Sequence, residues 1–244
     1  MSQQLPSLTT NAIDWTVVAA KGGLGALPFV GSLAAELVGN IIPNQRMDRI
    51  VRFLELLEVR VKGLEKSRLD GRKNDPQFVD IMEDAFFQAS RAVSQDRLEH
   101  IANVVANGIA PEEINQAETK RMLWLLGQLT DAEVVILRGS LVTTNEDHEA
   151  DVDFQTKHAE LLAPDSTYMG SSDEDFAKEA IKDSYRQHLH ELGLLKYRFS
   201  RPRRGEFPEF DDKTGMMKAA GYDVTHLGRM FLRYLNLIPQ WCGG

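Results

Sequence analysis

Apolar residues recur at helical spacing through the first half of the chain. Between residues 43 and 69 they lie alternately three and four positions apart, at Met47, Ile50, Leu54, Leu57, Val61 and Leu64. This is the spacing of a heptad seam, which predicts a helix that packs in a bundle or pairs with a second copy of the chain over 47–64. Glu58 and Lys62 lie four positions apart with the acid first, which predicts an exposed face on this helix.

Two more amphipathic helices are predicted before residue 111, each with a recognisable start. Asp75 precedes a proline, as at the start of many helices, and Ser94 is an N-cap residue before the next apolar stripe. That stripe ends near Gly108, and Pro111 follows. Residues 1–111 are therefore predicted to form an α-helical bundle.

The second half of the chain begins with helices and ends with strand-like segments. Thr130 and Glu133 have the spacing of a capping box, which predicts a helix start, and an acidic loop is expected over 145–153. A long helix is predicted over 173–192, with Gly193 as its C-terminal cap. Its apolar stripe consists of Phe176, Ala177, Ala180, Ile181, Tyr185, Leu189 and Leu192.

The end of the chain predicts a small β-hairpin. Residues 194–199 and 222–225 are strand-like, residues 200–214 are polar, and Thr225 caps a last helix. Three helices, a strand, a long loop, a strand and a helix make up the order of a winged helix. We therefore predict a mainly α protein, with a helical bundle over 1–111 and a winged-helix-like domain with a small hairpin over 112–244.

Three segments of the chain resemble the bacterial family of abortive-infection alpha proteins. They are the turn at Leu192, Gly193 and Leu194, residues 222–232, and more loosely residues 94–107. The resemblance implies phage defence in which the infected cell is shut down, and it implies no reaction.

The net charge of the chain restricts what its whole surface can bind, but it does not restrict what a local basic patch can bind. The net charge of −8 argues against a protein that coats nucleic acid or anionic lipid. Basic residues nevertheless gather on the long helix and in the wing, where they predict contact with duplex DNA or a partner. They are Lys178, Lys182, Arg186, Lys196, Arg198, Arg201, Arg203 and Arg204. Acidic residues on the same helix favour the competing interpretation, a protein contact or a solvated surface.

The most apolar part of the chain, residues 17–42, is rich in glycine. Lys21 and Glu36 are its charged residues, and the 14 uncharged residues between them are fewer than the roughly 20 that a membrane-spanning helix needs. We weigh a buried helical hairpin against a shielded segment that enters a membrane on activation. The residues that would pack or insert are Gly23, Gly25, Phe29, Gly31 and Gly39.

No motif in the chain predicts catalysis, a metal site or a cofactor. The run from Glu146 to Asp153 lacks the spacing of a calcium or zinc site, and no nucleophile elbow or phosphate-binding loop occurs. The single cysteine, Cys242, favours a cytoplasmic protein. Entry of residues 17–42 into a membrane would make this protein membrane-associated when activated. The first hypothesis is a non-enzymatic abortive-infection protein that contacts a partner protein or a membrane. The alternatives are a winged-helix DNA-binding regulator and an interaction scaffold.

Overall fold

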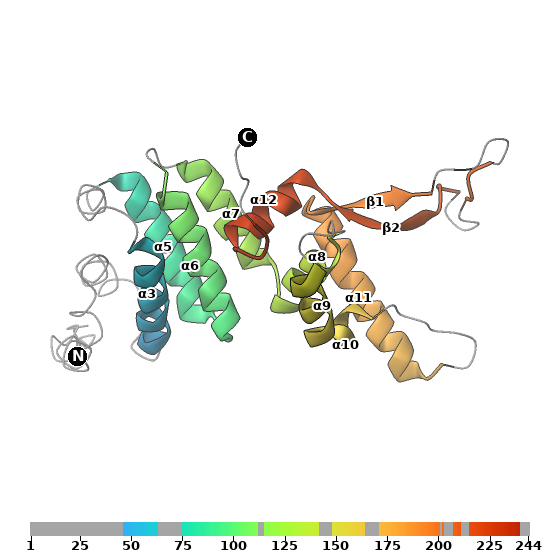
Figure 1. The fold of residues 1–244 in the computed structure, drawn as a ribbon, viewed down its shortest axis with the longest axis horizontal. Helices are drawn as coiled ribbons and strands as arrows, with labels where there is room; N and C mark the ends of the chain where they lie inside the picture. Colours follow the sequence, from blue (N-terminus) through green and yellow to red (C-terminus); the bar gives the residue numbers. More distant parts are fainter. Residues whose placement is uncertain are drawn as a thin grey trace, which may run out of the picture. The chain divides into compact units, whose positions relative to one another are not determined.

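The computed structural model describes residues 46–62, 75–111, 115–141, 148–163, 171–200, 202, 207–210 and 215–239 (Figure 1). It divides between Gly127 and Gln128 into two compact units. The first contains helices α3 (Met47–Val61), α5 (Pro76–Arg91), α6 (Gln95–Ile109) and α7 (Gln116–Gln128).

Helix α7 joins the first unit, although the boundary was predicted at 111/112. The Gln88 side-chain amide of α5 donates to the Leu123 carbonyl at 2.8 Å, and Arg97 of α6 donates to the Leu126 carbonyl at 2.7 Å. Met122, Leu123, Leu125 and Leu126 of α7 are buried. These contacts tie α7 to the bundle that precedes it.

The heptad seam of α3 forms part of the core of a single chain. Ile50, Leu54, Leu57 and Val61 are fully buried against α5 and α6. Phe53, which lies beside the seam, is also buried, and its ring meets that of Phe86 edge to face at 5.9 Å. Pairing of two chains through this seam remains a prediction.

The prediction that Glu58 lies on an exposed face of α3 is wrong. Its side chain is 4% exposed, and neither carboxylate oxygen has a hydrogen-bond partner within the part of the chain that the structure describes. Because α3 packs on two neighbouring helices, its buried stripe is wider than a heptad seam and includes the residue after Leu57. The i,i+4 charge pattern alone does not show this extra neighbour.

Over its described residues, the second unit consists of helices and one hairpin. It contains α8 (Asp131–Gly139), α9 (His148–Lys157), α10 (Ala159–Leu162), α11 (Asp173–Glu191), β1 (Leu195–Phe199), β2 (Ala219–Val224) and α12 (His226–Tyr234). The strands pair antiparallel, with Leu195 opposite Val224. A mainly helical fold with a small hairpin is thus confirmed. The acidic loop predicted over 145–153 is wrong from His148 onward, where α9 begins.

Strands β1 and β2 leave the corner at which α11 ends and α12 begins (Figure 1). Helix α11 is described along its whole length, and Leu189 is its one buried residue. The predicted apolar stripe of α11 is therefore exposed over most of its length, with Phe176 48% and Ile181 53% exposed.

None of the described helices is both long enough and apolar enough to cross a membrane. The glycine-rich segment 17–42, with Gly23, Gly25, Phe29, Gly31 and Gly39, lies outside the described residues.

Candidate interaction site on the hairpin unit

A buried carboxylate connects the start of α8 to the last turns of α11. Glu133 Oε2 accepts hydrogen bonds from the Thr130 amide at 2.7 Å and from the Thr130 hydroxyl at 2.8 Å, which completes the predicted capping box. Its other oxygen, Oε1, lies 2.6 Å from Nδ1 of His188 on α11. Glu133 is 3% exposed. The contact orients the end of α11 from which the hairpin begins.

The corner between α11, the hairpin and α12 depends on two glycines and a threonine. Gly193 has a φ of +75°, which lets the chain leave α11 directly into β1. The Thr225 hydroxyl donates to the Gly193 carbonyl at 2.7 Å and accepts from the Gly228 amide at 3.0 Å, so it caps α12 and closes the corner. A Cβ atom on Gly228 would lie 2.4 Å from the Leu194 carbonyl oxygen.

One face of the hairpin is aromatic. Tyr197 and Tyr222 are opposite one another in the register, with ring centroids 5.1 Å apart. His190 of α11 stacks on Tyr197 at 4.3 Å. Burial, and then the neighbouring Tyr197, raise the pKa of the Tyr222 phenol. This cluster fixes the base of the hairpin on α11.

The other face of the hairpin is charged. Lys196 and Arg198 alternate with the aromatic residues of β1, and Lys196 lies opposite Asp223. The Asp223 carboxylate is 3.5 Å from the Arg198 guanidinium. Arg198 passes over Gly221, where a Cβ atom would be 3.0 Å from its Nη2.

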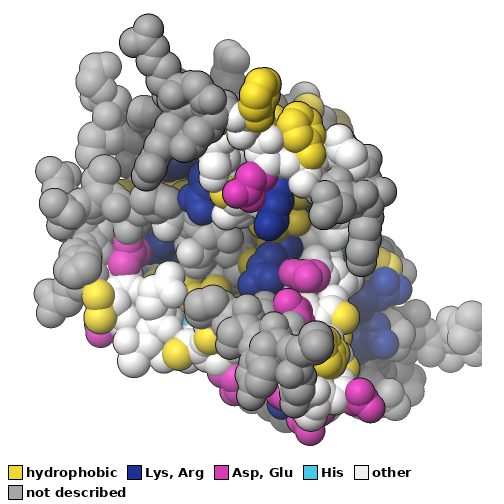
Figure 2. Space-filling view, turned by 90° about the vertical axis from the view of Figure 1, so that its right-hand side faces the viewer, with side chains coloured by type: hydrophobic (Ala, Val, Ile, Leu, Met, Phe, Trp, Pro, Cys, Tyr) yellow, Lys and Arg dark blue, Asp and Glu magenta, His cyan; other side chains and the backbone are white. Residues whose placement is uncertain are grey.

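The predicted basic residues of α11 each have a partner among the described residues. Lys178 pairs with Glu174 at 2.8 Å, and Arg186 pairs with Asp183 at 2.9 Å, both within α11. Lys182 donates to the Ala163 carbonyl at 3.3 Å. On the face in Figure 2, Lys and Arg side chains are likewise intermingled with Asp and Glu. Arg201, Arg203 and Arg204 lie outside the described residues.

Lys196 has basic neighbours that the sequence reading missed. A cavity of about 360 Å³ is lined by Lys196, Val224, Thr225, His226, Arg229 and Arg233. Arg229 and Arg233 are four positions apart and so share one face of α12. The sequence shows this spacing. It does not show that the two arginines lie near Lys196, because that depends on the pairing of β1 with β2.

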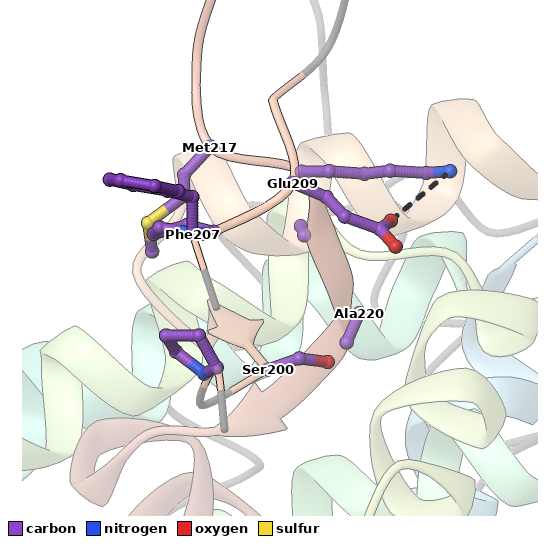
Figure 3. Close-up of a pocket in the computed structure, with 9 residues that line it drawn as sticks. Ser200, Phe207, Glu209, Met217 and Ala220 are labelled. Carbon is purple, nitrogen blue, oxygen red and sulfur yellow. Dashed lines mark ion pairs between the residues drawn. The ribbon is translucent and has the colours of Figure 1, made fainter. Parts of the chain in front are cut away.

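The outer part of the hairpin is apolar and exposed. Beyond β1 and β2, Phe210 bridges to Met217, and the Lys218 amide donates to the Glu209 carbonyl at 2.8 Å. A pocket of about 340 Å³ lies here, lined by Ser200, Pro202, Phe207, Pro208, Glu209, Met217, Lys218, Ala219 and Ala220. Phe207 and Met217 project on one side of it and Glu209 on the other, where Glu209 pairs with Lys218 at 3.9 Å (Figure 3).

We call the exposed aromatic and methionine side chains at this end of the hairpin the hairpin tip. It comprises Phe199, Phe207, Phe210, Met216 and Met217, which are 43%, 90%, 57%, 70% and 38% exposed. Exposed apolar groups gathered on one element are typical of interaction sites.

The described residues hold no group of three or more His, Cys, Asp or Glu side chains arranged to bind a metal ion. Comparisons with protein-family models, with curated proteins and with solved structures find no match to this chain.

Proposed function

We propose that this is a non-enzymatic protein of the abortive-infection type that acts by binding a partner protein through its hairpin unit. The observation that carries the proposal is the exposure of the hairpin tip. Phe207 is 90% exposed and Met216 70% exposed, on an element whose base is anchored by buried Leu195 and Val224. Aromatic residues and methionine are enriched in protein interfaces, where burying them in a partner releases water.

Helix α11 also exposes apolar side chains. Phe176 and Ile181 are about half exposed, whereas Leu189 is fully buried and His188 contacts Glu133. The charged residues of α11 satisfy one another at Lys178 and Arg186, which favours a protein partner over a polyanion.

A winged-helix-like arrangement is the finer form of this proposal. The order of α8, α10, α11, β1, β2 and α12 is compatible with it, and α10 and α11 both pack on α8. In that arrangement α11 would be the helix presented to the partner, and the hairpin would be the wing.

The test is survival of a bacterial culture during phage infection. Phe207→Ser with Phe210→Ser should abolish protection if the hairpin tip binds the partner. Val93→Ser is the matched control, because Val93 is also an exposed apolar residue, 92% exposed, but lies between α5 and α6 of the first unit. A photoreactive residue at position 207 should cross-link one protein, and the same residue at position 93 should not. Full protection by the Phe207 and Phe210 variant would refute the proposal.

The second candidate is a DNA-binding regulator. The observation that favours it is the closeness of Lys196 to Arg229 and Arg233 around one cavity. Duplex binding should then weaken steeply with salt, and alanine at Arg201, Arg203 and Arg204 should abolish it. The absence of a mobility shift at low salt would remove this candidate.

Two further predictions rest on the sequence alone: contact with a membrane through residues 17–42, and formation of a homo-oligomer. Leakage of dye from liposomes, abolished by Gly31→Asp, would support the membrane route. Equal leakage by the variant would count against a role for this segment.

A further inference from the structure

A second surface of the hairpin unit lies away from the hairpin tip, at the base of the hairpin. The cavity of about 360 Å³ there combines side chains of β1, the end of β2 and α12. A smaller cavity of about 230 Å³ adjoins it, shares Lys196, Val224 and Arg229, and adds Ser140 and Asp223. Cavities of a few hundred Å³ have the size of small-ligand sites.

The larger cavity is lined by three basic side chains. Lys196, Arg229 and Arg233 line it together, and its other lining residues include no acid. Neither Lys196 nor Arg229 forms an ion pair with another described residue. The smaller cavity includes the carboxylate of Asp223, which lies 3.5 Å from the Arg198 guanidinium.

The two arginines of α12 lie close enough to repel one another. Burial, and then the positive charge of Arg229, lower the pKa of Arg233. Like charges held together are unfavourable until an anion lies between them. An anion bound between them would therefore reduce the repulsion between Arg229 and Arg233.

We propose that this cavity binds a phosphate group, with Lys196, Arg229 and Arg233 as its ligands. The forked donors of arginine match the geometry of phosphate oxygens, and lysine adds a point charge. The Thr225 hydroxyl already contacts Gly193 and Gly228, and the Ser140 hydroxyl donates to Ile136. Recognition thus depends on the cations, and the cavity leaves room for the group that carries the phosphate.

The phosphate could belong to a small ligand or to a nucleic-acid backbone, and the experiment separates these sources. Isothermal titration of the full chain would use inorganic phosphate, adenosine 5′-monophosphate, adenosine and a short DNA duplex. We expect both phosphate-bearing small probes to bind and adenosine not to bind. Lys196→Ala and Arg229→Ala should each weaken binding at least about tenfold, the loss of one charge-assisted hydrogen bond, and Arg229→Glu should abolish it.

Lys218→Ala is the matched control, because Lys218 is an exposed lysine of the same hairpin but does not line this cavity. Circular dichroism would check that the variants keep their fold, which is expected because Lys196 and Arg229 are exposed. Binding of the duplex alone, lost in Arg229→Glu, would still support phosphate recognition and assign it to nucleic acid. Failure of every phosphate-bearing probe, or equal binding by Arg229→Glu, would overturn the proposal, whatever the fate of the partner-protein proposal.

Discussion

The carboxylate of Glu133 lies 2.6 Å from the imidazole of His188, although 55 positions separate the two residues along the chain. Because Glu133 also completes the capping box of α8, one buried side chain both starts that helix and holds the last turns of α11. The His188 side chain is 36% exposed and that of Glu133 is 3% exposed, so the contact lies at the edge of the core. The base of the hairpin depends on this link.

Glu133→Ala should destabilise the second unit by about 2 kcal/mol, because it removes the reciprocal cap and leaves the Thr130 amide and His188 without their acceptor. Glu133→Gln keeps an acceptor oxygen and should cost less. Urea unfolding measures the loss, and hydrogen exchange assigns it to α8 and α11. Glu174→Ala is the control, since that acid is 76% exposed, and it should change stability by less than about 0.5 kcal/mol. Equal effects of Glu133→Ala and Glu174→Ala would contradict the assigned role.

Replacing two helical glycines with alanine should affect the stability of the protein differently. Gly228→Ala should destabilise by about 1 to 3 kcal/mol, because the new methyl group would lie 2.4 Å from the Leu194 backbone oxygen. Gly127→Ala should be neutral or stabilising by up to about 1 kcal/mol, because its nearest neighbours are flexible Gln88 atoms at 3.5 Å. Thermal unfolding of both variants beside the parent protein measures the difference. A stabilising Gly228→Ala would show that the corner is looser than described.

Structural elements that depend on residues close together in the sequence were predictable. The cap residues Asp75, Ser94, Thr130 and Thr225 each accept a backbone hydrogen bond from two or three positions ahead. The hairpin followed from Gly193 and from strand-like runs on both sides of a polar loop. Such interactions are complete within a few residues, so the local pattern contains the information.

Features that depend on distant segments were not predictable in the same way. Glu58 is buried because α3 meets two other helices, and Arg229 approaches Lys196 because the hairpin brings residues 33 positions apart together. Of the predicted site, Lys196 lines the basic cavity, whereas Arg186 is occupied by Asp183 three positions away. Periodicity indicates which residues share a face, but not what that face meets.

The ion pair between α5 and α7 should make the stability of the first unit depend on pH. Lys120 Nζ lies 2.8 Å from both Asp80 oxygens, and this hydrogen bond is the main cause that lowers the Asp80 pKa and raises the Lys120 pKa. The Asp80 contribution is present above the unfolded carboxyl pKa of about 3.9 and is lost as pH falls through the folded value. The Lys120 contribution is present below about 10.4 and is lost as pH rises through its folded value.

Lys120→Met should therefore cost most between about pH 5 and pH 9 and least at either extreme. The cost should stay below about 1 kcal/mol, because both side chains are more than a third exposed and water screens the pair. Urea unfolding at a series of pH values gives the profile, and NMR titration should show the Asp80 pKa rising in the variant. A cost that does not vary with pH would indicate that packing of the lysine stem matters instead.

The exposed stripe of α11 can be tested against Leu189, the one buried residue of this helix. Leu189 is fully buried, so Leu189→Ala should destabilise the second unit by about 2 to 4 kcal/mol. Ile181 lies on the same helix and is 53% exposed, so Ile181→Ala should change stability by less than about 0.5 kcal/mol. The periodic pattern places both residues in one apolar stripe, but only Leu189 is buried. If the stripe contacts the partner, Ile181→Ala should reduce cross-linking from position 207 while unfolding stays unchanged. A large loss of stability on Ile181→Ala would instead place Ile181 in a core and remove α11 from the proposed interaction surface.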